Sequence, residues 1–409
     1  MNIWLTSLDV PEVAIVNTRL RGREGLWDII VENGRIARIS KHSGSVRAPV
    51  DAQGCLTTES FVIAHLHLDK VRTADRASAS ALSGYQGGSM DTRRSIALAA
   101  RVKERYDRSE ILSRSRRAAE EALHYGVTHM RAFADTDTKS KLEAVRALLE
   151  LKQEFSGRLE IQVVAFPQEG IEADPGAEEY VEKAIELGAD VVGGIPWLER
   201  GEAKQKRHID KMFAIAKAHR RPVAMLVDDA GDPRLRTLEM LASKTIEERM
   251  QGRVEACHAR AMQLYPERYA RKVARLCAKA RIGVVSSPHT GPLYARVDLL
   301  ERAGVTVALG QDDCADAYYP YGRCNMMEVA FLASHILRVM GREDAERLYD
   351  MITSKPAEIM GLGEFGLQVG KEASMAVLAQ TTVREALTYH ERPRAVFNRG
   401  NLVASAPDY

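Results

Sequence analysis

The stretch "SEILSRSRRAAEEALHYGVTHMRAF", Ser109 to Phe133, indicates how this chain folds. Apolar residues recur on one face of its first part, which predicts an amphipathic helix. Gly126 marks the end of that helix, because glycine readily takes the conformation that closes one. "VTHMRAF" then follows as a short, largely apolar strand. The stretch therefore predicts a helix that leads directly into a buried strand.

The same succession of helix and strand recurs along the chain. "KLEAVRALLELKQEF" precedes "LEIQVVAF", "AEEYVEKAIELG" precedes "ADVVGG", and "IDKMFAIAKAH" precedes "RPVAMLV". Counted from the first histidine pair onward, the predicted strands end near His67, Phe133, Phe166, Gly194, Val227, His258, Ser286 and Asp312. Eight such units over about 300 residues predict an α/β fold of the (β/α)8 TIM-barrel type rather than a doubly wound sheet.

The two ends of the chain have a different residue pattern, which is typical of short strands. "VAIVNTRL" and "DIIVENGRIARIS" are rich in β-branched residues, and the second contains the turn signal Asn33-Gly34. After Gly366 the chain returns to short strands with turn glycines. We therefore predict that residues 1–57 and 366–409 form one small composite β-sandwich domain, and that residues 58–365 form the barrel.

Composition narrows the class of protein. The 409 residues carry a formal net charge of +2 with 28% charged residues, which does not favour nucleic acid or an anionic membrane as a partner. Five scattered cysteines without C-x-x-C spacing argue against a disulfide framework or a thiolate zinc site. No apolar run approaches the 18 or so residues that span a bilayer. The start "MNIWLTSLDVPEV" does not resemble a signal peptide. We expect a cytoplasmic protein whose partner is a small-molecule substrate.

Histidine and aspartate side chains fall at three predicted strand ends. "FVIAHLHLDK" places His65 and His67 two residues apart, so both point to the same side of the first strand. His258 ends the sixth strand and Asp312 the eighth. Barrel active sites form at these carboxyl ends. Imidazole and carboxylate together suit Zn²⁺ or Fe²⁺ with one position left for water. A buried structural histidine at position 258 and a helix cap at Asp312 remain the alternatives.

Several long motifs resemble one known family. They are "HLHLDK", "IQVVAFPQEGI", "GADVVGGIP" and "VTVALGQDDCADAYYPYGRCNMMEVA". Together they resemble the amidohydrolase superfamily, in the branch of cytosine deaminase and N-isopropylammelide isopropylaminohydrolase, and the resemblance covers nearly the whole chain. It implies a metal-dependent barrel hydrolase, and a homo-oligomer is a family-level expectation.

The resemblance also implies roles for single residues. His65, His67 and Asp312 match the metal ligands, and Asp312 would also take a proton from the attacking water. His258 would orient that water, and Gln168 would contact the amide edge of the substrate. We further predict that Asp313, which follows Asp312, contacts the substrate.

The chain departs from the family pattern at several strand ends. The fifth strand of relatives ends in a motif like H-C-D-E, whereas "LVDD" here puts Leu226 at the ligand position and Asp229 at the position of the proton-carrying glutamate. Phe133 and Trp197 stand where relatives have histidine, and we predict that both contact the substrate. Aspartate is about one methylene shorter than glutamate, so Asp229 carries a proton only if the pocket is tight.

These features lead to one prediction with two alternatives. We predict a hydrolase that cleaves a C–N bond in a small nitrogen heterocycle other than cytosine, using one weakly held divalent metal, zinc or iron. One alternative is a metal-poor relative that binds a ligand without hydrolysing it. The other keeps the metal and uses it as a Lewis acid for isomerisation or lyase chemistry. The small-residue stretch Ala77–Met90, in the first loop after a barrel strand, is expected to be either a lid or a disordered loop.

Overall fold

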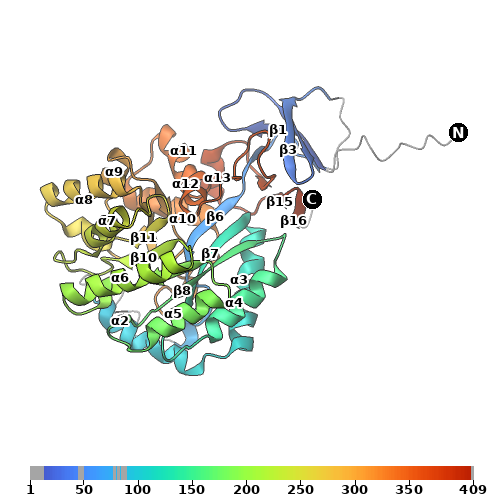
Figure 1. Cartoon of the computed structure of the whole chain (residues 1–409). Helices are drawn as coiled ribbons and strands as arrows, with labels where there is room; N and C mark the ends of the chain where they lie inside the picture. Colours follow the sequence, from blue (N-terminus) through green and yellow to red (C-terminus); the bar gives the residue numbers. More distant parts are fainter. Residues whose placement is uncertain (1–12, 45–49, 77–79, 81–82, 84–89, 407–409) are drawn as a thin grey trace.

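The structure is a computed structural model that describes residues 13–44, 50–76, 80, 83 and 90–406. Within these residues a parallel sheet of eight strands forms the larger part of the molecule, in simple sequence order (Figure 1). The strands are β6 (Phe61–Leu66), β7 (Val127–Asp135), β8 (Glu160–Phe166), β9 (Val191–Gly194), β10 (Val223–Val227), β11 (Val254–His258), β12 (Gly283–Ser286) and β13 (Val307–Leu309). All their residues are buried except Glu160 and Gln162 on β8, which are partly exposed, as expected of parallel strands covered on both faces.

The sheet closes on itself at the first histidine pair. A parallel bridge joins Leu66 of β6 to Asp312, just beyond β13. The amide of Asp312 donates to the carbonyl of His65 at 2.9 Å, and the amide of His67 donates to the carbonyl of Asp312 at 2.8 Å. Barrel closure therefore places the histidine pair and the aspartate, 245 or more residues apart in sequence, side by side.

Helices surround the barrel (Figure 1). The α-helices are α2 (Thr92–Ala99), α3 (Arg108–His124), α4 (Glu143–Glu154), α5 (Ala177–Glu186), α6 (Glu202–Ala218), α7 (Thr237–Glu247), α8 (Glu267–Ala280), α9 (Val297–Arg302), α10 (Met326–Leu337), α11 (Arg342–Asp350), α12 (Ser354–Ile359) and α13 (Val383–Tyr389). The short 3-10 helices are η1 (Ala74–Arg76), η2 (Ala100–Arg105), η3 (Pro196–Leu198), η4 (Arg260–Leu264) and η5 (Pro288–Thr290).

The predicted passage from helix to strand occurs as α3 followed by β7. Gly126 joins them with a φ of 86°, a left-handed conformation that favours glycine. A Cβ atom there would lie only 2.8 Å from the ring of Phe61 on the neighbouring strand. Glycine is thus needed both for the turn and for the close contact between helix end and barrel.

Both ends of the chain build the second sheet. Its strands are β1 (Val13–Leu20), β2 (Trp27–Glu32), β3 (Arg35–Lys41), β4 (Val50–Asp51), β5 (Leu56–Glu59), β14 (Met375–Val377), β15 (Ala395–Asn398) and β16 (Asn401–Ser405). β14 pairs antiparallel with β5, which joins the C-terminal strands to the N-terminal ones (Figure 1). This sheet has its own apolar core, which includes Ile15, Ile29 and Phe397.

The predicted fold class, a (β/α)8 barrel with a small β-domain from both termini, is confirmed. The domain limits at residues 57/58 and 365/366 stay a prediction. Among the described residues, no helix is both long and apolar enough to cross a membrane. The five cysteines are buried and unbridged.

Candidate active site

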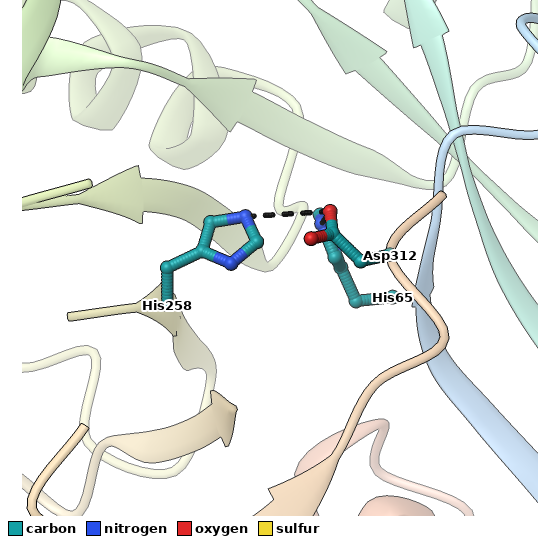
Figure 2. Close-up of side chains that lie close together, drawn as sticks. All are labelled: His65, His258 and Asp312. Carbon is teal, nitrogen blue, oxygen red and sulfur yellow. Dashed lines mark hydrogen bonds and ion pairs between the residues drawn. The ribbon is translucent and has the colours of Figure 1, made fainter. Parts of the chain in front are cut away.

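Three imidazoles surround one oxygen atom of Asp312 at the carboxyl ends of the barrel strands. Oδ1 of Asp312 lies 3.1 Å from Nε2 of His65, 3.6 Å from Nε2 of His258 and 4.0 Å from Nε2 of His67. All four side chains are almost completely buried. Figure 2 shows the ring of His258 facing the carboxylate of Asp312, with His65 beside it. The predicted strand-end residues therefore do converge.

The backbone at these strand ends is unusual. His258, Ala259 and Asp312 have φ values of 71°, 50° and 65°, and Asp228 beyond β10 has 49°. Residues other than glycine avoid this left-handed region at a cost of about 1–2 kcal/mol each. Such strain persists where the surrounding structure fixes it, and it concentrates at functional sites. Here it turns the chain sharply so that side chains beyond the strand ends point into the barrel mouth.

The charge state of the cluster follows from its surroundings. Burial holds the pKa of His67 and of His258 well below the usual value, and the nearby cations Lys70 and Arg260 act in the same direction. Burial alone would raise the pKa of Asp312, but His258, His65 and Arg260 together hold it well below the usual range. His67 and His258 are thus neutral imidazoles beside an ionised Asp312.

This donor set fits a divalent transition metal. Donor atoms of His65, His258 and Asp312 all lie within 4.8 Å of one another, and so do those of His67, Asp312 and Asp313. Neutral imidazole nitrogen and carboxylate oxygen are ligands that zinc and iron accept. The triad predicted from the sequence, His65, His67 and Asp312, lies within this cluster, and its selection as the ligand set stays a prediction.

The fifth barrel strand, β10, carries only buried apolar side chains. Leu226 near the end of β10 is buried and pairs in register with Cys257 of β11. Asp229, three residues on, is buried and lies 2.8 Å from Nε of Arg260 through Oδ1. Burial raises the pKa of Asp229 to about 7, with Arg260 opposing the rise and Asp312 adding to it. Asp229 can therefore hold or release a proton near neutral pH.

Arg260 is a site residue that sequence reasoning misses. It is 1% exposed, and its Nη2 donates to Asp312 Oδ2 at 3.0 Å and to Thr290 Oγ1 at 2.7 Å. The same atom lies 3.4 Å from Nδ1 of His258. Its position two residues after His258 is the only signal, and it does not reveal that the strained turn directs the side chain inward.

Lys70 is a second site residue whose place the sequence does not reveal, because a lysine beside Asp69 is expected to be solvated or salt-bridged at the surface. It is 5% exposed, and its Nζ contacts Asp135 at 2.6 Å, Oε1 of Gln168 at 3.0 Å and Nδ1 of His67 at 3.3 Å. The expected partner Asp69 lies farther away, at 3.8 Å. Lys70 therefore belongs to the buried polar network of the site.

A cavity of about 20 Å³ lies over the cluster. Its lining residues are His67, Thr92, Ile96, Gln168, Leu226, Asp229, His258, Asp312, Asp313 and Tyr318. Two of the predicted substrate residues, Gln168 and Asp313, are among them.

The other two predicted substrate residues lie outside that lining. Phe133 packs behind the cluster, with its ring centroid 4.3 Å from that of His65. Trp197 of η3 is completely buried beneath Arg93. Their predicted contact with substrate, like that of Gln168 and Asp313, stays a prediction. Apart from Ser80, Ser83 and Met90, the stretch Ala77–Met90 lies outside the described residues.

The fold and the site together define a class: a (β/α)8 barrel in which imidazole and carboxylate donors meet at the carboxyl ends of the strands. The sequence profile of the Amidohydrolase family matches residues 86–404, and the chain belongs to this family.

Individual relatives match over almost the full chain. N-isopropylammelide isopropyl amidohydrolase of Pseudomonas sp. (strain ADP) is 28% identical over 96% of this chain and 97% of its own length. Pterin deaminase of Rhizobium rhizogenes is 25% identical over 99% of this chain and 94% of its own. The crystal structure of 5-methylcytosine deaminase from Klebsiella pneumoniae with 5-fluorocytosine superposes with a TM-score of 0.88 and 31% identity, over 96% of this chain and 97% of that one. The resemblance seen in the sequence is confirmed.

Proposed function

We propose that the protein is a metal-dependent hydrolase that cleaves a C–N bond in a small nitrogen heterocycle other than cytosine. The observation that carries this proposal is the convergence of three buried imidazoles on one oxygen of Asp312. The relatives support the substrate class, because those described above act on an ammelide, a pterin and a methylcytosine.

His65, His67 and Asp312 are the residues proposed to hold one zinc or iron ion, with His258 adjacent. When bound, such an ion lowers the pKa of a coordinated water so that hydroxide is available at neutral pH. The remaining chemistry belongs to side chains of this chain.

Two carboxylates are proposed to move protons. Asp312 accepts the proton of the attacking water, while Thr290 at 2.6 Å and Arg260 at 3.0 Å hold its Oδ2 in place. Asp229, whose pKa is raised by burial to about 7, carries a proton to the leaving nitrogen of the substrate. His258 steadies the attacking oxygen through a hydrogen bond at Nε2.

The cavity offers hydrogen-bond donors to a substrate ring. Lys70 donates to Oε1 of Gln168, which lines the cavity, and the amide nitrogen of Gln168 is proposed to donate to the substrate. Burial, Asp312 and Asp316 hold the pKa of Asp313 well above its usual range, so burial favours the protonated form of this side chain, which can donate a hydrogen bond. These donors suit a ring with carbonyl oxygen or ring nitrogen acceptors. Cytosine itself is not the proposed substrate, because Phe133 and Trp197 stand where relatives of the resembling branch have histidine.

Substrate entry requires movement. The cavity of about 20 Å³ is far below the few hundred Å³ of an ordinary small-molecule pocket. Thr92 and Ile96 of α2 are among its lining residues, so we propose that α2 moves outward when a ring binds.

A second candidate function is a barrel that binds a heterocycle without hydrolysing it. Leu226 removes one ligand, and Arg260 already pairs with Asp312, so the metal site is weakened in two ways. This alternative predicts ligand binding without turnover.

One experiment separates the two. The protein is loaded with zinc, iron or manganese and assayed for release of ammonia or amine from amino- and alkylamino-substituted oxo-pyrimidines, triazines and pterins. His65→Ala serves as the control, with metal content measured in both proteins. Release of amine that depends on metal and is lost in His65→Ala supports the hydrolase. Binding of a ring without release by any metal-loaded form rejects it.

A further inference from the structure

A guanidinium group lies among the buried carboxylates of the site. Nε of Arg260 is 2.8 Å from Oδ1 of Asp229, and Nη2 is 3.0 Å from Oδ2 of Asp312. The side chains of Arg260, Asp229 and Asp312 are at most 4% exposed. One cation thus joins the two carboxylates to which the proposed function assigns the proton transfers.

The surrounding chain is shaped to hold this cation. Thr290 bridges the pair, because its hydroxyl lies 2.7 Å from Nη2 and 2.6 Å from Asp312 Oδ2. Nη1 donates to the carbonyl of Leu293 at 3.3 Å. Gly291 leaves the necessary room, since a Cβ atom there would lie 2.6 Å from Nη1. The loops after β10, β12 and β13 all contact Arg260, which indicates a permanent position for its guanidinium.

The position of Arg260 has an electrostatic effect, because a cation there compensates buried negative charge. A buried carboxylate without a partner is strongly destabilising, and two nearby ones are worse. In a barrel with a full ligand set, a divalent ion neutralises such groups. Here the fifth strand carries Leu226. The sixth strand is followed by Arg260, whose guanidinium is positively charged at any ordinary pH. The fixed positive charge of Arg260 therefore offsets part of the negative charge of Asp229 and Asp312 when no metal is bound.

The hydrogen bonds at Nδ1 of His258 and of His67 also indicate a weakened metal site. A histidine that binds metal normally donates its second ring N–H to an acceptor, which turns a lone pair toward the ion. Nδ1 of His258 instead faces Arg260 at 3.4 Å, and Nδ1 of His67 faces the ammonium of Lys70 at 3.3 Å. Both partners are cations and hydrogen-bond donors, so neither ring has the acceptor that normally stands behind a metal-binding histidine.

We propose that Arg260 is a resident counter-ion, which keeps the site folded without metal and competes with a divalent metal for Asp312. The proposal rests on the proposed function in so far as Asp312 is the shared ligand. It makes the site one in which metal binds weakly and reversibly to a fold already complete.

Zinc affinity tests this competition. Zinc is titrated against a chromophoric chelator into the wild type, Arg260→Met and Arg234→Met. Arg234 is the matched control, since its side chain is 88% exposed and pairs only with Asp232 among its described contacts. Arg260→Met should bind zinc at least about ten-fold tighter than wild type, because Asp312 is released, and Arg234→Met should match wild type. Equal or weaker zinc binding by folded Arg260→Met overturns the proposal.

Thermal unfolding of the wild type gives an independent result if Arg260→Met does not fold. We compare the Tm of the wild type after treatment with a chelator with its Tm in a low concentration of zinc. The two values should agree within about 2 °C, because a weak ligand stabilises little. A large fall in Tm after chelation overturns the proposal. The outcomes for the hydrolase are separate: tighter zinc in Arg260→Met without turnover refutes only the proposed function, and turnover with unchanged zinc affinity refutes only the role of Arg260.

Discussion

Arg260 and Asp312 share a hydrogen bond of 3.0 Å between Nη2 and Oδ2, while the other oxygen of Asp312 faces His65 at 3.1 Å. The carboxylate is therefore divided between a permanent cation and the imidazole cluster. One oxygen is fixed in place, and the other is available for a metal or a proton. This division is the feature that distinguishes the site from a plain cluster of metal ligands.

The two adjacent aspartates should respond differently to amidation. Asp312→Asn should lower kcat/KM of the metal-loaded enzyme by about 100-fold or more, because asparagine neither accepts a proton nor binds metal well. Asp313→Asn should stay within about five-fold, because the pKa of Asp313 is held well above its usual range and asparagine resembles the protonated acid. Steady-state kinetics on both variants measures the contrast, and the reverse order would contradict these roles.

The rate should depend on pH through Asp229. Its pKa is raised to about 7 by burial, and its proposed role needs the protonated form. The kcat/KM should therefore fall as pH rises through about 7. Asp229→Asn should lower activity at least about 100-fold and leave no such transition. A rate profile of the wild type that is flat from about pH 6 to 8 would remove Asp229 from proton transfer.

A methyl group at position 291 should disturb the cation. The φ of Gly291 is −175°, so alanine is not strained there, but its Cβ would lie 2.6 Å from Nη1 of Arg260. Gly291→Ala should lower the free energy of unfolding by about 1–3 kcal/mol. Gly363→Ala is the control, because nothing lies within 4 Å of a Cβ atom there. Urea denaturation compares the two, and equal stability of both variants would show that the cradle is not tight.

Stability should fall in mild acid because of His129. Burial, with a smaller effect of Arg399, lowers its pKa to about 4 in the fold, against 6.5 when unfolded. Between these values the unfolded chain binds the extra proton, so stability is complete above pH 6.5 and decreases toward pH 4. The share of His129 is about 3 kcal/mol.

His129→Gln should reduce this dependence by about 2 kcal/mol between about pH 4.5 and 7, measured as the free energy of unfolding at these two pH values. His335→Gln, at an exposed position of α10, is the matched control. Identical pH profiles for His129→Gln and wild type would show that His129 is not buried as described.

The barrel is predictable from the sequence because its signal is periodic and local. Helices end near a glycine such as Gly126 or Gly188, and each following strand is short and apolar. Strand ends are also visible in sequence, so the positions of His65, His258 and Asp312 along the chain suffice to assign all three to one barrel mouth. That mouth is where parallel strands of a barrel must converge.

Arg260 and Lys70 cannot be predicted in the same way. Their inward direction depends on the left-handed backbone at His258 and Ala259 and on partners such as Asp135, 65 positions away from Lys70 in sequence. Long basic side chains are usually solvated, so composition and spacing give no reason to bury them. Trp197 is packed beneath Arg93, and its predicted contact with the substrate stays a prediction.

The most direct test of the central claim is anomalous diffraction from crystals grown with excess zinc, recorded on both sides of the zinc absorption edge. The account predicts one edge-dependent peak within about 2.0–2.2 Å of Oδ1 of Asp312 and of an imidazole Nε2 of the cluster, absent from crystals of His65→Ala. Wild-type crystals with no edge-dependent peak among His65, His67, His258 and Asp312 would contradict it.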